Sequence, residues 1–177
     1  MTNEDHVLFH EAVRGLLAGD FSRLTPLFDL PPGGSSYPII EWHEAGLFAG
    51  EPGALAEAFT CACFLGRERV VKYFLEKGVN PSGGVKTGLD AFHWAANRGQ
   101  VDVVRILIQC KASLETRSMH GSTVLGTAVW SAINEPRAEH MKVIAALIDA
   151  GAQVKVAGYP TGNERVDEVL RRHIGPT

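Results

Sequence analysis

The chain has 177 residues, of which 45% are hydrophobic, and its formal net charge is −3. This size suits one or two ordinary domains or four to five short repeats, and the hydrophobic fraction is sufficient for a continuous core. The negative charge argues against nucleic acid as a partner. The sequence also contains no apolar run of the roughly 18 residues that a membrane span requires, so we expect no membrane insertion.

The cysteines indicate a reducing environment. Cys61, Cys63 and Cys110 form an odd set without metal-ligand spacing. The first ten residues are polar and acidic, which is unlike a secretory signal. We therefore expect a cytoplasmic protein.

The N-terminal part predicts a helical cap. Residues 4–18 and 21–30 are expected to form two helices separated by Gly19-Asp20. The side chains expected to face inward are Leu8, Ala12, Val13, Leu16, Leu24, Leu27 and Phe28. A loop over residues 31–36 follows, then a short helix over residues 39–48, and Pro52 is suited to open the next helix.

The middle of the chain repeats itself after 33 residues. Gly66 corresponds to Gly99, and Val70-Val71 corresponds to Val103-Val104. A fixed period of this size is typical of stacked helical units, which commonly serve as binding surfaces.

Each unit is predicted to be a helical hairpin. A short helix ends in small residues, Ala95 and Ala96, and Gly99 is expected to adopt a positive φ where the chain turns back. The next helix presents one broad apolar face. This face consists of Val103, Val104, Leu107 and Ile108.

This pattern resembles the ankyrin repeat. Residues 90–96 stand where that family has Thr-Pro-Leu-His-x-Ala-Ala, with His93 at the family's histidine and with Asp90 and Ala91 departing from its threonine and proline. The resemblance implies an all-α solenoid. It also implies that His93 bonds to the backbone of an adjacent turn and ties neighbouring repeats together.

A third copy begins at residues 121–128 and continues at residues 141–152. Fifteen positions separate Ala128 from Val143, against eight between Ala95 and Val103, so this copy carries about seven extra residues. The resemblance is strong over residues 55–154. We expect an N-terminal cap over residues 1–50, three repeats over residues 51–157 and a closing helix over residues 158–177.

The C-terminal helix is predicted over residues 164–173, capped by Thr161 or Asn163. Its charged side chains are expected to face solvent. They are Glu164, Arg165, Asp167, Glu168, Arg171 and Arg172.

Catalytic and metal signatures are weak. His6, His10 and Glu11 share one helical face, but a closed metal site needs further ligands. Asp90 and His93 lack a nucleophile or a substrate pocket in reach. We expect no catalytic residue, no metal and no cofactor.

The resemblance implies a protein partner bound through a concave groove and through the turn tips. The two positions after each small-residue pair line the groove in ankyrin repeats, and large side chains there resemble the anchors of binding hot spots. The residues predicted to contact a partner are Phe64, Leu65, Asn97, Arg98, Trp130 and Ser131 in the groove, and Leu89 and Arg117 at the tips.

Three alternatives remain open. Phe64 and Trp130 are covered if the insertion, or the helix over residues 39–48, folds over them. The insertion at residues 130–138 and the turn at residues 159–163 form a small-ligand or enzymatic pocket if their polar groups converge. An exposed end face is a self-assembly surface if the chain associates, although we expect a monomer.

Overall fold

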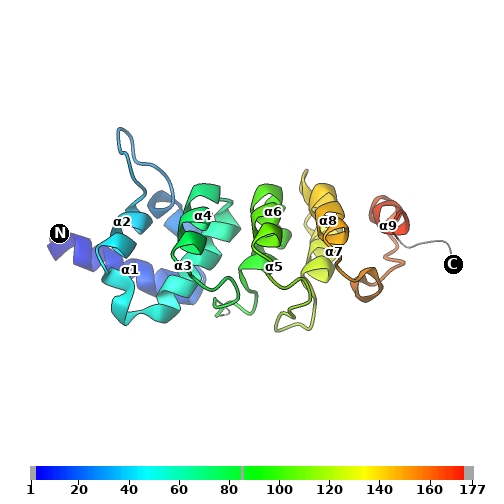
Figure 1. Ribbon diagram of the computed structural model, residues 1–177, viewed down its shortest axis with the longest axis horizontal. Coiled ribbons are helices and arrows are strands. Elements are labelled where there is room, and N and C mark those ends of the chain that lie inside the picture. Colours follow the sequence, from blue (N-terminus) through cyan, green and yellow to red (C-terminus); the bar gives the residue numbers. More distant parts are fainter. Residues whose placement is uncertain (1–2, 85, 174–177) are drawn as a thin grey trace. The chain divides into compact units, whose positions relative to one another are not determined.

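The computed structural model describes residues 3–84 and 86–173, which form α-helices and short 3-10 helices without β-strands (Figure 1). The all-α prediction is therefore confirmed. The chain divides into two compact units, residues 1–91 and residues 92–177. This division follows the density of contacts, so the three-part division into cap, repeats and closing helix stays a prediction.

The first unit contains four α-helices and two 3-10 helices. They are α1 (Asn3–Ala18), η1 (Phe21–Leu27), α2 (Pro38–Glu44), η2 (Leu47–Gly50), α3 (Pro52–Leu65) and α4 (Glu68–Glu76). Proline stands at the start of α2 and of α3, where its missing N–H has no helical partner to lose. The expected role of Pro52 as a helix opener is confirmed.

The buried face of α1 differs by one position from the sequence prediction. Ala12, Val13 and Leu16 are buried as expected, but Leu8 is 54% exposed and Phe9 is buried in its place. The Phe9 ring packs edge-to-face on Phe48, with ring centroids 5.1 Å apart. A stripe that begins at Phe9 keeps the i, i+3, i+4, i+7 spacing of a single helical face.

The expected helix over residues 21–30 is shorter and tighter than predicted. It is the 3-10 helix η1, which ends at Leu27 and contains Pro26. Proline lacks a backbone donor and disfavours a continuing α-helix, which explains the early end. Phe21 and Phe28 are fully buried at the two ends of this segment, while Leu24 and Leu27 are only half-buried.

The α3–α4 hairpin is the first regular copy of the repeat. Gly66 has φ +71° at the end of α3, and Val70, Val71 and Phe74 of α4 are fully buried. Cys61 and Cys63 are buried on α3, and burial raises the pKa of the Cys61 thiol well above its usual range. Cys61 is therefore a protonated thiol at neutral pH and packs as a small apolar side chain.

The second unit contains the other repeats and the closing helix. Its elements are α5 (Ala91–Arg98), α6 (Val101–Gln109), α7 (Val124–Asn134), α8 (His140–Asp149), η3 (Val154–Ala157) and α9 (Glu164–Arg171). Helix α8 contacts α6, α7 and α9 (Figure 1). The expected stacking of the second repeat on the third is confirmed. The residues that stack, all fully buried, are Val103, Val104, Leu107, Val143, Ile144 and Leu147.

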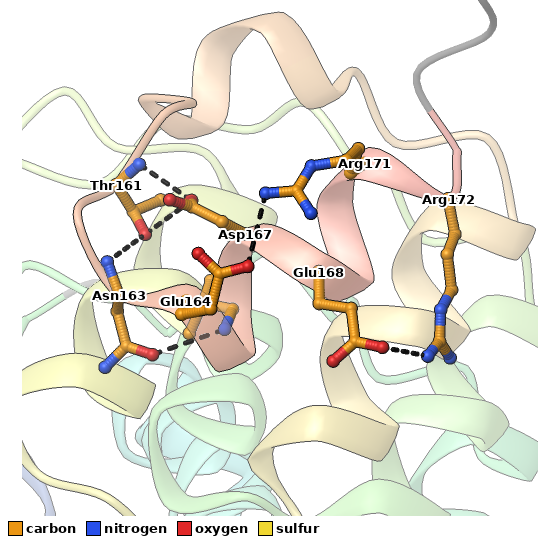
Figure 2. A network of polar contacts seen from close by, with 8 residues as sticks. Thr161, Asn163, Glu164, Asp167, Glu168, Arg171 and Arg172 are labelled. Carbon is orange, nitrogen blue, oxygen red and sulfur yellow. Dashed lines mark hydrogen bonds and ion pairs between the residues drawn. The ribbon is translucent and has the colours of Figure 1, made fainter.

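The closing helix α9 is tied to the turn before it (Figure 2). The Asn163 side chain accepts a hydrogen bond from the Val166 N–H, so the capping prediction is confirmed for Asn163. Asp167 was expected to face solvent, which is wrong: it is buried and accepts hydrogen bonds from the N–H and the hydroxyl of Thr161, at 2.8 and 2.7 Å. The Thr161 N–H bond lowers the pKa of Asp167, and the charged carboxylate thus fixes the turn.

Candidate functional site

Trp130 is the large aromatic side chain that α7 leaves in solvent. It is 52% exposed, whereas Val129 and Ser131 on either side are buried. Its carbonyl oxygen accepts a hydrogen bond from the Asn134 side chain, at 2.8 Å. The insertion therefore leaves the greater part of the indole uncovered, which decides between the two alternatives that the sequence left open for Trp130.

Asn97 and Ser131 occupy groove positions in the sequence register, but both side chains are buried. The Asn97 amide donates a hydrogen bond to the Ser131 hydroxyl, at 2.8 Å, and so connects α5 to α7. A buried pair that satisfies its own polar groups is not accessible to a partner. Their expected place on the contact surface is corrected to a structural role between repeats.

His140 anchors the insertion to the preceding repeat. The Arg137 backbone N–H donates to His140 Nδ1, at 3.1 Å, which leaves the proton of the neutral ring on Nε2. That Nε2 donates to the carbonyl oxygen of Asn97, at 2.8 Å. The ring is fully buried, and burial is the main cause that lowers the pKa of His140. His140 is thus a neutral connector that uses both ring nitrogens.

Arg98 lies at the end of α5, close to the insertion. Its side chain is half-buried, and burial lowers its pKa, followed by the positive charge of Arg137. The negative charge of Glu135 acts in the opposite direction. The charges that act on Arg98 thus include those of Arg137 and Glu135, which the insertion supplies.

In the first unit, Phe64 and Leu65 end α3, and both are half-buried. The Phe64 ring packs edge-to-face on Phe21, with ring centroids 5.5 Å apart. An aromatic neighbour of Phe64 is thus supplied by η1. This contact orients the ring and leaves part of it in solvent.

The turn tips in the second unit are held by backbone and side-chain hydrogen bonds. Arg117 is exposed, and its guanidinium donates to the Gly121 carbonyl, at 2.7 Å. His93 is buried, and its Nε2 donates to the Ser122 carbonyl, at 3.0 Å. The prediction that His93 bonds to the backbone of the adjacent turn is confirmed. Leu89, the other tip residue predicted to contact a partner, is half-buried.

A pocket of about 400 Å³ lies beside the insertion. It is lined by side chains of α7, the insertion, α8 and α9, among them Ile133, Arg137, Met141, Asn163 and Arg165. Of the polar groups that an enzymatic pocket was expected to bring together, Asn163 contributes to the lining, and its oxygen already caps α9. The charged side chains in the lining are those of Arg137 and Arg165.

Over residues 3–84 and 86–173, no three His, Cys, Asp or Glu side chains gather in a way that could hold a metal ion. In the same residues, no helix has the length and apolar character needed to cross a bilayer.

Comparison with known proteins identifies the architecture. The family model described as ankyrin repeats in three copies matches residues 59–157, which is more than half of the chain. The chain belongs to the ankyrin-repeat family. A relative, the Ankyrin repeat and KH domain-containing protein mask of Drosophila melanogaster, is 32% identical over 99 residues. The aligned region covers 56% of this chain and about 2% of that much longer protein.

Ankyrin repeats are generally protein–protein interaction modules. The ankyrin register places Trp130 and Arg98 where partner contacts are common, but it does not single out His140. In the repeat register His140 corresponds to Gln100 of the second copy, and it directly follows the extra residues. The sequence signal that could have pointed to His140 is its position between the extra residues and the helix α8, which is largely buried. The repeat motif does not include this signal.

Proposed function

We propose that this ankyrin-repeat chain is a non-catalytic module that binds a protein partner. Each unit is proposed to contribute its own contact surface, made of the groove positions that retain solvent exposure and of the turn tips. In the second unit these are Arg98, Trp130 and Arg117, and in the first unit they are Phe64, Leu65 and Leu89. The buried hydrogen bond from Asn97 to Ser131 connects α5 and α7, the helices that carry Arg98 and Trp130. We also propose that the chain acts as a monomer in the cytoplasm.

The exposure of Trp130 carries this proposal. Tryptophan is among the residue types most enriched at binding hot spots, since a rigid aromatic surface gains much from burial and loses little entropy. The backbone beneath it is part of a regular helix whose inner face is buried, so the side chain is held ready for contact. A preformed surface of this kind needs little ordering on association.

The test compares two variants in partner capture from native lysate, quantified by mass spectrometry. We expect the double variant Trp130→Ala, Arg98→Ala to lose the captured partner while the melting temperature stays within about 3 °C of wild type. The matched control is Leu8→Ala on α1, whose side chain is 54% exposed and lies outside the proposed surface. This control should capture the same amount of partner as wild type.

Two results would refute the proposal. A large fall in melting temperature with capture intact would mean that Trp130 supports the fold rather than the interaction. Equal loss of capture in the double variant and in Leu8→Ala would mean that capture depends on exposed apolar groups in general.

A further inference from the structure

The pocket beside the insertion is lined by both apolar and positively charged residues. Ile133, Met141 and Val166 supply apolar lining from α7, α8 and α9. Arg137 and Arg165 line the same pocket from the insertion and from α9. A volume of about 400 Å³ falls within the usual range of roughly 300–1,000 Å³ for pockets that receive a ligand group.

Among the described residues of the chain, neither arginine forms a salt bridge with a carboxylate. The ion pairs among those residues involve other arginines, such as Arg105 with Asp102 and Arg172 with Glu168, and the pocket lining contains no carboxylate. Guanidinium groups bind carboxylates through charge-assisted hydrogen bonds, often two at a time. The pocket therefore offers its positive charge to an external acidic group.

The backbone that carries both arginines is fixed. The Arg137 N–H is bonded to the buried His140 ring, and Arg165 lies in the first turn of α9, just after the Asn163 cap. Because the backbone at both arginines is anchored, it needs little rearrangement when the pocket binds a ligand.

The positive region continues toward α5. Arg137 lies close enough to Arg98 for its charge to lower the Arg98 pKa, with Glu135 partly offsetting it. Ile133 in the pocket lining is one helical turn from Trp130 on α7, so the pocket and the proposed contact surface share a helix.

We infer that the pocket receives an apolar side chain from an acidic peptide segment of the partner protein, whose carboxylates are bound by Arg137 and Arg165. This inference rests on the proposed function and names the chemistry of the partner. The apolar lining residues favour a peptide over a nucleic acid, because phosphates pair with the arginines but leave these residues without a partner.

The experiment measures fluorescence anisotropy of a labelled peptide, Glu-Asp-Glu-Leu-Phe-Glu-Asp-Glu, with the full chain. We expect saturable binding that weakens at least tenfold in Arg137→Glu, Arg165→Glu. The matched control is Arg105→Glu, Arg172→Glu, which makes the same change in net charge on exposed, ion-paired arginines of the same unit. It should bind within about twofold of wild type, and circular dichroism melts check that all variants fold.

A second arm tests the apolar anchor. The same peptide with Ala-Ala in place of Leu-Phe should bind at least tenfold more weakly. Equal weakening by both arginine pairs, equal binding of the Ala-Ala peptide, or no binding up to 1 mM would overturn the inference. So would binding of an oligouridine 12-mer or of phosphatidylserine vesicles with the same dependence on Arg137 and Arg165.

The two proposals fail separately. If Trp130→Ala, Arg98→Ala loses the lysate partner while Arg137→Glu, Arg165→Glu retains it, the interaction function stands and the acidic-peptide pocket is wrong. If the peptide binds through the two arginines while no variant alters lysate capture, the pocket stands and the proposed partner surface is wrong.

Discussion

The second and third ankyrin repeats close the same kind of helical hairpin by different means. Between α5 and α6 the turn is made by Gly99, whose φ of +71° reverses the chain directly after the helix. Between α7 and α8 the chain uses residues 135–139, and the side chain of His140 accepts the Arg137 N–H. A regular repeat relies on backbone freedom, whereas the irregular one relies on a buried side chain.

The turn glycine of the second repeat, Gly99, lies next to His140 of the third. A Cβ atom added at Gly99 would lie 3.3 Å from Cδ2 of His140, so the glycine supplies both the turn and the space for the ring. His140 in turn bonds to the Asn97 carbonyl on the same hairpin. The insertion is therefore anchored to the second repeat and is not a free loop.

This anchoring also explains why equivalent positions differ in exposure. Asn97 is buried and is bonded to Ser131 of α7 and to His140 of α8, which come from the following repeat. Trp130 occupies the corresponding position in the third repeat, where η3 and α9 come next instead of another repeat, and it stays 52% exposed. The end of the repeat array is thus where an aromatic side chain becomes available.

The largest effect is expected from His140→Ala. Its removal leaves a cavity and deprives the Asn97 carbonyl and the Arg137 N–H of their partners, so we expect a loss of about 3 kcal/mol in the free energy of unfolding. Urea unfolding measures this loss. His120→Ala, at an exposed turn tip, serves as the control and should change stability by less than about 0.5 kcal/mol. Similar small effects for both variants would show that the insertion is not held by His140.

An intermediate effect is expected from Gly99→Ala, which should lower the free energy of unfolding by about 2 kcal/mol. Backbone strain at positive φ adds to the close contact of the new Cβ with His140. Gly121→Ala has a similar φ of +77° with nothing within 4 Å of the added Cβ, so it should cost about 1 kcal/mol from backbone strain alone. Thermal unfolding of both variants measures the difference. In a His140→Ala background that difference should shrink, and an unchanged difference would rule out crowding of His140 as its source.

The smallest change in the free energy of unfolding is expected when the pH is lowered. Since burial lowers the pKa of His140 from 6.5, the unfolded state binds a proton more readily than the folded state. The contribution of His140 is complete above about pH 6.5 and is lost as the pH falls from there through the folded-state pKa. Urea unfolding between pH 7.5 and 5.5 should show this loss in wild type and a smaller one in His140→Gln, which cannot titrate.

Other groups contribute to the same pH profile. His43 has a pKa lowered by burial, so its contribution has the same sign, whereas the buried Glu57 has a raised pKa and acts in the opposite direction. The difference between wild type and His140→Gln isolates the single residue. Parallel profiles for the two proteins would contradict the role assigned to His140.

Local sequence patterns predicted most of the helical framework. The positive φ of Gly99, the start of α3 at Pro52, the Asn163 cap and the His93 bond to the adjacent turn follow from residue chemistry or from the repeat motif. The candidate surface was predicted less completely. The side chains of Arg98 and Trp130 are partly exposed, as a contact surface requires. Those of Asn97 and Ser131 are buried and hydrogen-bonded to each other.

By itself, the sequence determined the period, the turn glycines and the apolar faces, because these depend on helix geometry within a few residues of each position. Only the tertiary structure decided that Phe9 is buried rather than Leu8, that Asp167 turns inward, and that His140 holds the insertion against Gly99. Each of these depends on which distant segment packs against the residue. The exposure of Trp130 belongs to the same class, since burial at a repeat position depends on the element that packs next to it in space.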